Sequence, residues 1–411
     1  MLLAHRTAWA AAWLCTASLA MGSDVSLAGT TTCHTHTAVA GDTLIGLSQH
    51  YLAQPMQWQL LARANRVPDP RRIPIGTRLC IPVDQMKSTP KSGVVLEVVG
   101  EATAKSGDKT TQAGAGRAVQ KGDPVPPGMS LRTSPNGYVT VQLADGSILK
   151  IQANTEAKLE SSQHYEEAGF YASVWSVLRG RVESLVTHLT GGQPRYQIKT
   201  PQAVLGVRGT EFRVATDGRR TLGETLTGTV AVSSGQQTAL INAGQGTIAD
   251  AQNKVAPPLP LPSAPPLDGL PKLFERPLLR IDLPSVPGAS SYRLQIAEDA
   301  DFRRVRAELT DTQTHFRISD LPDGRYHLRM RVANAQGLEG RDAVATFQLK
   351  ARPEPPIPTA PGHQAKLRAR EATLNWTSHP QATRYRVQIA RDALFTQLVT
   401  EQTDLRDTHW Q

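Results

Sequence analysis

Two proline-rich segments set the limits within which this chain can fold. They read VAPPLPLPSAPPLDG at residues 255–269 and ARPEPPIPTAPG at residues 351–362. Such a composition favours extended polyproline II structure, which makes a semi-rigid spacer between folded units. A length of 411 residues is also typical of about two to four domains. We therefore expect separate domains joined by linkers at residues 251–276 and 351–364, rather than one compact enzyme.

The first 22 residues have the pattern of a secretory signal peptide. His5 and Arg6 precede an apolar run at residues 8–20, which is too short to span a bilayer, and SLA at residues 18–20 forms a small-residue cleavage site. No later stretch of sequence reaches the length and apolarity of a membrane span. The sequence therefore predicts a mature chain that is periplasmic or secreted and has no integral membrane span.

The formal net charge of +9 raises the question of a nucleic-acid partner. Export separates the chain from most nucleic acid, and its aromatic residues, which make up 5% of the sequence, form no stripe interleaved with basic residues. We therefore expect no nucleic-acid partner. Two interpretations of the charge remain, namely attraction to an anionic cell wall or outer surface and a basic surface without a specific partner.

Residues 34–82, HTHTAVAGDTLIGLSQHYLAQPMQWQLLARANRVPDPRRIPIGTRLCIP, have the pattern of a small helical unit closed by strands. Turn, capping and proline residues predict four elements. These are a strand at 36–39, a helix from Thr43, a helix ending at Asn65 and a strand at 78–81.

This strand-helix-helix-strand unit resembles a LysM domain, a module that binds N-acetylglucosamine-containing glycans such as peptidoglycan and chitin. The matching residues are GDTL at 41–44, Trp58, Ala64-Asn65, Asp69-Pro70, Gly76 and Ile81-Pro82. The resemblance implies a small α+β (βααβ) domain at residues 33–83, with a glycan site made of two loops. The implied site residues are Gly41, Asp42, Thr43 and Leu44 in the first loop, and Asn65, Arg66, Val67 and Ile73 in the second.

Two loops lying side by side offer backbone N–H and C=O groups to an acetamido group, while small apolar side chains cover the sugar face. For the side chains of Asp42 and Asn65 a second interpretation stays open, in which they only cap local structure. Gly46 inside the first helix departs from the family pattern. It should weaken that helix by roughly 0.5–1 kcal/mol relative to Ala.

Cys33 and Cys80 flank this unit, and the third cysteine, Cys15, lies in the signal peptide. In an oxidising compartment we expect the pair to form a disulfide, because the terminal strands of a LysM fold lie side by side. Closing a loop of this size would stabilise the module by about 4 kcal/mol. The alternative is a zinc site that adds His34 and His36, although these spacings fit no familiar zinc motif. No cofactor is predicted.

Residues 93–250 are expected to form an all-β domain, because short alternating segments there are separated by turn signals. One example is YVTVQL at residues 138–143, which is followed by Asp145-Gly146 and by SILKI at residues 147–151. This is the pattern of a β-hairpin.

The most specific run of the chain is TPQAVLGVRGTEFRV at residues 200–214. It predicts two strands, 203–207 and 211–214, which reverse where Gly209 permits a positive φ. With its flanks, this segment resembles the FecR domain. The matches are LRGRV at 178–182, AGQ at 243–245 and, most closely, Val207, Arg208, Gly209, Thr210, Glu211 and Phe212.

The namesake of the FecR family is a membrane-spanning periplasmic sensor that passes a signal from an outer-membrane receptor to a cytoplasmic sigma factor. The sequence shows neither the cytoplasmic segment nor the membrane helix that such a relay needs. The resemblance therefore implies the fold and a contact with an unidentified envelope protein. For Arg208 and Glu211, the favoured interpretation is that both side chains bond to neighbouring backbone, rather than to a ligand.

An internal repeat lies in the last third of the chain. YRLQIAEDADF at residues 292–302 matches YRVQIARDALF at residues 385–395. Alternating apolar positions in both copies predict strands with one buried face. The unit resembles a fibronectin type III-like β-sandwich, with Trp376 at the position of that family's core tryptophan and Leu283 at the same place in the first copy.

We expect one such sandwich at residues 277–350 and a partial second repeat at residues 365–411. The second copy ends before a counterpart of DGRYHLRMRV, residues 323–332 of the first copy, appears. Half a sandwich leaves an open apolar face and an unpaired edge. We therefore expect either a longer natural chain or a poorly ordered tail.

No catalytic constellation emerges from the sequence. It has no serine nucleophile elbow, no HExxH, no phosphate-binding glycine-rich loop and no CxxC pair, and no spacing forces two carboxylates together. The favoured interpretation is a non-enzymatic envelope scaffold that is anchored to glycan and presents its β domains to proteins. The alternatives are a periplasmic signalling component acting through the FecR-like domain, and a fragment of an envelope enzyme with a catalytic domain beyond residue 411.

Overall fold

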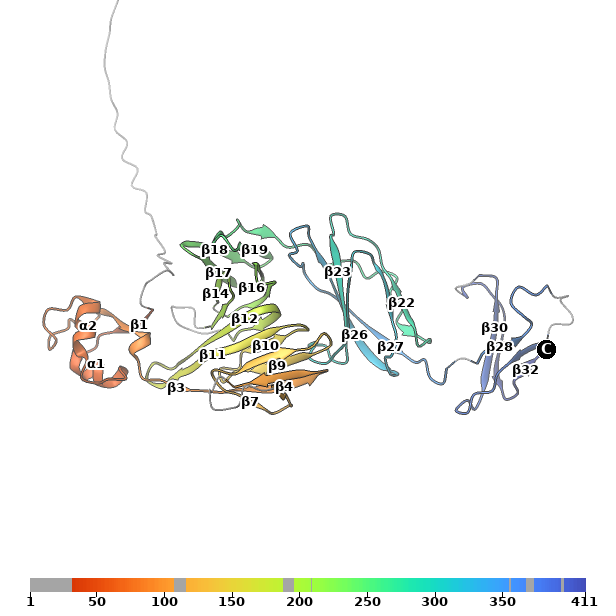
Figure 1. Ribbon diagram of the computed structural model, residues 1–411, viewed down its shortest axis with the longest axis horizontal. Helices are drawn as coiled ribbons and strands as arrows, with labels where there is room; N and C mark the ends of the chain where they lie inside the picture. The colour runs from red at the N-terminus through yellow and green to blue at the C-terminus, as the bar shows by residue number, and fades with distance from the viewer. Residues whose placement is uncertain are drawn as a thin grey trace, which may run out of the picture.

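The computed structural model describes residues 32–106, 116–187, 196–207, 209–354, 356–366, 373–392 and 395–411. The predicted signal peptide, residues 1–22, lies outside these ranges. A small module with two helices is followed by a central β domain, a β-sandwich and a set of short C-terminal strands, in this order along an elongated molecule (Figure 1). The expected fold class, a small α+β module followed by all-β domains, is confirmed. Within the described ranges, no helix has the length and apolarity needed to cross a membrane.

The N-terminal module contains the four expected elements. They are β1 (Cys33–Thr37), α1 (Leu44–Tyr51), α2 (Trp58–Asn65) and β2 (Arg78–Pro82), followed by a short 3-10 turn (Val83–Gln85). β1 begins earlier than residue 36 because it pairs antiparallel with β2 along its whole length. α1 begins one residue later than expected because Thr43 is its N-cap. The Oγ1 atom of Thr43 accepts a hydrogen bond from Gly46 N at 3.0 Å.

The predicted disulfide between Cys33 and Cys80 is confirmed, and their Cα atoms lie 5.0 Å apart. The bridge joins β1 to β2 and closes the module. The alternative zinc site is wrong, because both sulfur atoms are used in the disulfide. Among the described residues, no group of three or more His, Cys, Asp or Glu side chains is placed to hold a metal ion.

The central domain is built from the strands of two sheets, which pair with each other to form a closed barrel. The strands are β3 (Thr89–Pro90), β4 (Gly93–Val99), β5 (Ala102–Lys105), β6 (Arg117–Ala118), β7 (Pro124–Val125), β8 (Ser130–Thr133), β9 (Tyr138–Gln142), β10 (Ile148–Ile151), β11 (Glu156–Tyr165), β12 (Phe170–Leu185), β13 (Tyr196–Lys199), β14 (Val204–Val207), β15 (Glu211–Thr216), β16 (Arg220–Thr227), β17 (Thr229–Ser234), β18 (Gln237–Asn242), β19 (Gln245–Asp250) and β20 (Leu259–Pro260). Their inward faces enclose a buried core that includes Trp175, Tyr196 and Phe212.

The long strand β12 belongs to both sheets. Its first part pairs with β11 and β13, and its second part pairs with β10 and β15. Gly180 lies where the strand passes from one sheet to the other, with φ +99. A Cβ atom at Gly180 would lie 2.5 Å from the Cα atom of Thr155, so this crossing requires glycine.

The strands of both local predictions for this domain are present, but the second pair of strands is not paired with each other. The hairpin expected at residues 138–151 is present, because β9 pairs antiparallel with β10 and Gly146 in the turn has φ +84. The two strands expected within residues 200–214 are also present as β14 and β15. However, β14 pairs with β13 and β17, whereas β15 pairs with β12 and β16. The turn at Gly209 therefore moves the chain between the two sheets instead of closing a hairpin.

The N-terminal module packs against the tip of the β11–β12 hairpin, as Figure 1 shows. Tyr165 and Phe170 flank a 3-10 turn (Glu166–Ala168) at this tip, and both are buried in the same apolar cluster as Leu44, Leu61 and Ile81 of the module. Burying aromatic side chains removes much apolar surface from water. The module therefore has a defined attachment to the central domain and is not held by a free linker.

The first proline-rich segment is not the spacer that we expected. β20 pairs with β19, and β21 (Leu273–Phe274) pairs in parallel with β27 of the sandwich. Pro262 O accepts a hydrogen bond from Arg341 N at 3.0 Å. The segment's prolines lack backbone N–H donors, but its carbonyl groups can accept hydrogen bonds and its leucines can pack. The segment can therefore lie as an edge strand beside a sheet. Leu259 and Leu261 pack against a cluster that contains Leu338.

The sandwich has two sheets around one core. Its strands beyond β21 are β22 (Leu279–Asp282), β23 (Ser291–Ala297), β24 (Val305–Asp311), β25 (His315–Ile318), β26 (Gly324–Ala333) and β27 (Ala343–Leu349). One sheet has the order β21-β27-β26-β23-β24, and the other is β22-β25. Tyr292, Leu294 and Ile296 point into the core, as their alternation predicts. The sandwich architecture is thus present, and its assignment to the fibronectin type III family stays a prediction.

The second copy of the repeat forms strands without a comparable core. The strands are β28 (Pro358–Ala360), β29 (Leu374–Trp376), β30 (Tyr385–Ala390), β31 (Leu398–Leu405) and β32 (His409–Trp410). Trp376 is the only buried residue in the described parts of residues 352–411. Ile389, the counterpart of the buried Ile296, is exposed. In its described ranges, this segment therefore has the open apolar face that half a sandwich is expected to leave.

The central domain and the sandwich meet at a group of buried charged residues, which we call the interface cluster. Its members are Arg181, Glu183, Arg213 and Glu224 from the central domain and Arg293, Arg329, Arg331, Glu339 and Asp342 from the sandwich. Arg213 is fully buried, lies 2.8 Å from Glu224 and donates to Gly340 O at 2.6 Å across the interface. Buried charges are retained only where they are paired. The cluster therefore ties the two domains together through specific geometry.

Candidate functional site

The two loops that the sequence singled out in the N-terminal module lie side by side. Leu44 N, at the end of the first loop, donates to Pro70 O in the second loop at 2.9 Å. Gly76 N donates to Ala38 O at 2.8 Å, and Ala38 N donates to Thr77 O at 2.9 Å. One backbone hydrogen bond thus joins the two loops directly, and two more join the segments next to them, Ala38 before the first loop and Gly76-Thr77 after the second. The loops together form the candidate site.

The side chain of Asp42 is engaged inside the first loop. Its Oδ2 atom accepts a hydrogen bond from Val39 N at 2.8 Å and lies 2.8 Å from His36 Nε2. Two hydrogen bonds lower the pKa of Asp42, and the one from His36 has a larger effect than the one from Val39. The carboxylate therefore fixes the turn that leads into α1. A contact between this carboxylate and a ligand would compete with these bonds.

The side chain of Asn65 is also engaged within the module. Its Oδ1 atom accepts from Cys80 N at 2.6 Å, and its Nδ2 atom donates to Cys80 O at 2.8 Å and to Leu61 O at 2.9 Å. The amide of Asn65 therefore joins the end of α2 to β2 through hydrogen bonds. These contacts agree with the interpretation in which Asp42 and Asn65 act within local structure, and they leave ligand contacts to the loop backbone and its exposed side chains.

The other site residues predicted from the sequence divide into buried and exposed groups. Leu44 and Ile73 are buried, Val67 packs against the same core, and Thr43 caps α1. Gly41 and Arg66 are exposed, with φ +92 and +54. The first loop therefore exposes its backbone at Gly41, and the second loop exposes Arg66 together with Pro68, Asp69, Arg71 and Arg72.

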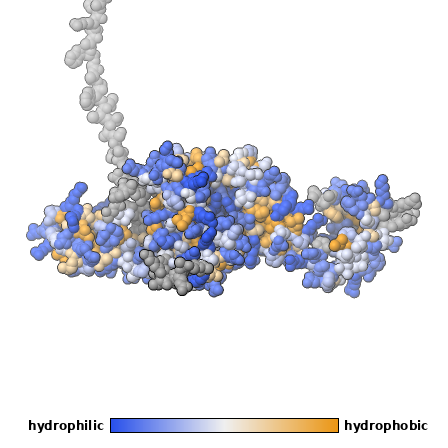
Figure 2. All heavy atoms as spheres, in the orientation of Figure 1, coloured by the Kyte–Doolittle hydropathy of each residue, from blue (hydrophilic) through white to orange (hydrophobic). Residues whose placement is uncertain are grey.

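Two exposed apolar side chains at this end of the module were missed from the sequence. Val39 is 58% exposed and Ile75 is 73% exposed, and each is next to a residue of the Ala38–Gly76 hydrogen bond, which joins the segments beside the loops. The sequence signal is an apolar residue one or two positions before a turn glycine, Gly41 or Gly76. Figure 2 shows small apolar areas among hydrophilic atoms on the visible face of this module. Such small apolar areas suit the faces of sugar rings.

Comparison with known families agrees with this geometry. The family model described as LysM domain matches residues 36–82, and the family model described as FecR protein matches residues 129–231. The chain contains a LysM domain and a FecR domain. A search of curated proteins finds no match.

Two solved structures are similar to parts of the chain. One is a proposed anti-sigma factor from Parabacteroides distasonis, with 16% sequence identity and a TM-score of 0.27 over 32% of this chain and 59% of that chain. The other is the extracellular domain of a proposed one-component system from B. thetaiotaomicron, with 11% identity and a TM-score of 0.15 over 54% of this chain and 35% of that chain. The chain thus spans less than two thirds of either structure.

The most specific FecR motif residues are mainly structural in the described part of the chain. Val207, Thr210 and Phe212 are buried, and Gly209 has φ +60 at the turn between the sheets. Glu211 is exposed, and its backbone N–H donates to Thr227 Oγ1 at 2.9 Å. Arg208 lies outside the described residues. The interpretation of Arg208 and Glu211 as a pair bonded to neighbouring backbone therefore stays a prediction.

Proposed function

We propose that this protein is a non-enzymatic cell-envelope protein that binds peptidoglycan, or a related N-acetylglucosamine glycan, through its LysM domain. The observation that carries this proposal is the hydrogen bond from Leu44 N to Pro70 O, which joins the two loops at the end of the module where Gly41 and the apolar side chains of Val39 and Ile75 are exposed. An exported, periplasmic or secreted location follows from the predicted signal peptide and from the distribution of the glycan.

In this proposal the FecR domain and the sandwich contact protein partners. The support is that both are β domains without an assembled catalytic group in the described residues, and that the interface cluster fixes their mutual arrangement. The alternative of a periplasmic signalling component is supported by the FecR match alone. It predicts a partner on the FecR domain and does not require the LysM loops.

The test is sedimentation of the full chain with purified peptidoglycan. The variant Val39→Ser/Ile75→Ser removes exposed apolar groups next to both loops, and Met56→Ser makes a matched change at a 77% exposed side chain in the turn between α1 and α2. We expect the double variant to bind about tenfold more weakly, because losing two sugar-covering side chains removes about 1.4 kcal/mol or more. The Met56→Ser variant should bind like the wild type.

Salt separates glycan recognition from nonspecific charge attraction. At 1 M ionic strength, where the Debye length is about 3 Å, backbone-led sugar contacts should persist while attraction of a basic chain to an anionic wall disappears. Thermal unfolding of all variants checks that they remain folded. Loss of all binding in high salt, or equal weakening by Met56→Ser, would remove the support for a glycan anchor and favour the signalling alternative.

A further inference from the structure

The segment of the LysM domain that leads from the end of α2 to β2 is rich in arginine. Residues 63–78 contain five arginines and a single carboxylate, that of Asp69. All five arginines are exposed, and they are Arg63, Arg66, Arg71, Arg72 and Arg78. Such a concentration of one sign of charge attracts anions to this part of the module.

The guanidinium groups of this segment have few partners in the protein. Within the described ranges, none of them forms an ion pair, and their one hydrogen bond runs from Arg63 Nε to Gln59 O at 3.4 Å. The side chain of Asp69 is directed to the backbone instead, because its Oδ1 atom accepts from Arg71 N at 2.9 Å. The arginines are therefore available to an anion from outside the chain.

Three of these arginines belong to the second loop of the candidate glycan site. Arg66 is the C-cap of α2 and has φ +54, which turns the chain into the loop. Arg71 and Arg72 directly follow Pro70, whose carbonyl accepts the hydrogen bond from Leu44 N that joins the two loops. We call Arg66, Arg71 and Arg72 the loop arginines.

The loop arginines lie at the end of the module that the central domain leaves open. α1 begins at the first loop, and its last turn carries His50, which lies 3.4 Å from Glu167 at the tip of the β11–β12 hairpin. The hairpin therefore contacts the opposite end of α1. A long glycan strand has access to the loops and to the loop arginines together.

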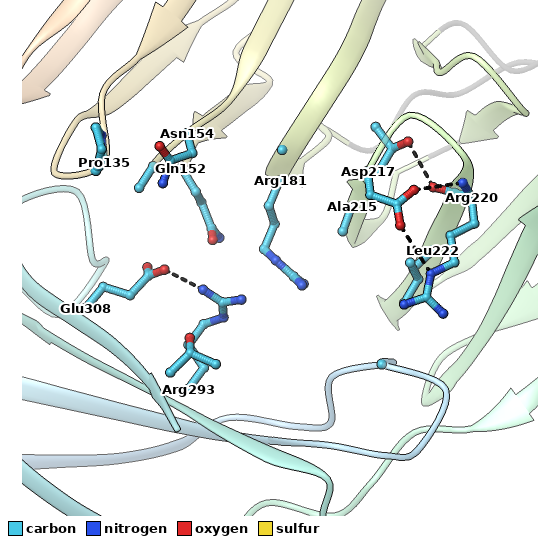
Figure 3. Close-up of a pocket in the computed structure, with 15 residues that line it drawn as sticks. Pro135, Gln152, Asn154, Arg181, Ala215, Asp217, Arg220, Leu222, Arg293 and Glu308 are labelled. Atoms are coloured by element: carbon cyan, nitrogen blue, oxygen red, sulfur yellow. Dashed lines mark hydrogen bonds and ion pairs between the residues drawn. The ribbon is translucent and has the colours of Figure 1, made fainter. Parts of the chain in front are cut away.

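The arginines of the cleft between the FecR domain and the sandwich have the opposite arrangement. In this cleft of about 590 Å³, Arg293 forms an ion pair with Glu308 (Figure 3). Arg220 lies 3.5 Å from Asp217 in the same view. The protein supplies anions to these arginines, whereas it supplies none to the loop arginines within the described ranges.

The anion that suits the loop arginines is a carboxylate beside a sugar. A guanidinium group can donate two parallel hydrogen bonds to a carboxylate, and charge-assisted bonds are stronger than neutral ones. Peptidoglycan and chitin both present N-acetylglucosamine to the loops, but only peptidoglycan carries stem peptides with free carboxylates beside its sugars. Arginines next to the loops therefore add affinity for one glycan and not for the other.

We propose that the loop arginines bind the stem-peptide carboxylates of a glycan strand held by the two loops, and so make the LysM domain selective for peptidoglycan over neutral, chitin-type glycans. This selectivity rests on the proposed function, because the proposed function places the sugars in the loops. It adds the residues that distinguish the two glycans.

The experiment titrates the full chain with three soluble probes by isothermal titration calorimetry at low salt. They are a peptidoglycan tetrasaccharide with its stem peptides, the same fragment with its carboxylates converted to amides, and the N-acetylglucosamine tetramer. Both peptide-bearing fragments have acetylated amines, so that they differ only in their carboxylates. We expect the carboxylated fragment to bind about tenfold more tightly than the amidated one. At 1 M ionic strength, where the Debye length is about 3 Å, this preference should disappear while the tetramer still binds.

The variant Arg71→Gln/Arg72→Gln removes two of the loop arginines. It should bind the carboxylated and amidated fragments within about twofold of each other, with an unchanged affinity for the tetramer. Arg280→Gln/Arg325→Gln is the matched control, because it removes the same charge from two exposed arginines of the sandwich. The control should keep the full preference.

Arg66→Gln keeps the test decisive if thermal unfolding shows that the double loop variant does not fold. It should weaken binding of the carboxylated fragment by about two- to threefold, as expected for one exposed charge contact. Equal binding of the carboxylated and amidated fragments by the wild type would overturn the selectivity. An unchanged preference in the folded loop variants would do the same, and an equal loss in the sandwich control would indicate a basic surface without a specific partner.

Failure of the selectivity and failure of the proposed function give different results. Binding of the tetramer without a preference for the carboxylated fragment would refute the role of the loop arginines and leave the proposed function standing. Absence of binding to both the tetramer and the amidated fragment would refute the glycan anchor itself, and with it the selectivity.

Discussion

The substitution Glu339→Gln tests the interface cluster most directly, because this carboxylate contacts arginines from both domains. Its oxygens lie 2.6 Å from Arg293 Nε, 3.2 Å from Arg181 Nη1 and 3.3 Å from Arg331 Nη1. Its backbone N–H also donates to Glu224 Oε1 at 2.6 Å. The change to Gln keeps the shape and the backbone contact but removes the negative charge.

The expected magnitude follows from these contacts. A unit charge about 4 Å from an opposite charge gains about 4 kcal/mol at an effective dielectric constant of about 20. The cost of burying the Glu339 carboxylate, several kcal/mol, offsets part of the total from three guanidinium groups. Removing one partner of a buried ionic group typically costs about 3–5 kcal/mol. We expect Glu339→Gln to lower the free energy of unfolding of the FecR–sandwich unit by this amount.

The assay is urea unfolding of the full chain, followed by hydrogen exchange so that protection is assigned to each domain. Glu275→Gln is the matched control, because Glu275 makes an exposed ion pair with Arg386 at 3.4 Å. Exposed pairs contribute about 0–1 kcal/mol. A loss below about 1 kcal/mol for Glu339→Gln, or an equal loss for both variants, would show that the cluster does not hold the domains together.

Three further predictions concern separate parts of the molecule. The variant Cys33→Ser/Cys80→Ser should lose about 4 kcal/mol of LysM stability by the loop-closure estimate, which hydrogen exchange in the module measures. Burial raises the pKa of Glu339 but neighbouring guanidinium groups outweigh it, so the pKa is lowered from 4.5. Its contribution is therefore present above the unfolded value and lost as pH falls below about 4.5, and acid unfolding should be less steep in Glu339→Gln. Gly180→Ala should destabilise the FecR domain by about 2–3 kcal/mol through positive φ and the clash described above, against about 1 kcal/mol for Gly122→Ala, where a Cβ has open space.

Each of these predictions has an outcome that contradicts it. Unchanged exchange in the module without the disulfide would mean that packing on the β11–β12 hairpin alone closes the fold. Equal acid sensitivity of the wild type and the Glu339→Gln variant would show that groups other than Glu339 cause the acid unfolding. Equal cost for the two glycine substitutions in thermal unfolding would show that the sheet crossing can relax.

Local structure was accessible from the sequence where short-range chemistry determines it. The capping residue Thr43, the paired cysteines and the turn at Gly146 each act on neighbours or on a small closed unit. Periodicity likewise identified the buried face of β23. These features depend on backbone geometry and hydrophobic patterning, which a sequence displays directly.

Features that depend on contacts between distant segments were not accessible. Arg213 and Glu224 look like ordinary charged residues in strands, and nothing local shows that they are buried against the sandwich. The proline-rich segment was misjudged for the same reason, since its pairing with β19 depends on a neighbouring sheet edge. In the candidate glycan site, the loops could be predicted, but the internal bonding of Asp42 and Asn65 became visible only when their three-dimensional partners were known.

The shared strand β12 has a mechanical consequence. Phe170 at its start packs into the LysM domain, while Arg181 and Glu183 near its end belong to the interface cluster. A strand of 16 residues spans about 50 Å. A protein held by its LysM domain and pulled through its sandwich would thus carry the load along one covalent backbone, with hydrogen bonds of two sheets loaded in shear beside it. The distance between the sandwich and a glycan bound to the LysM domain would then be set by the length of β12 and not by a flexible linker.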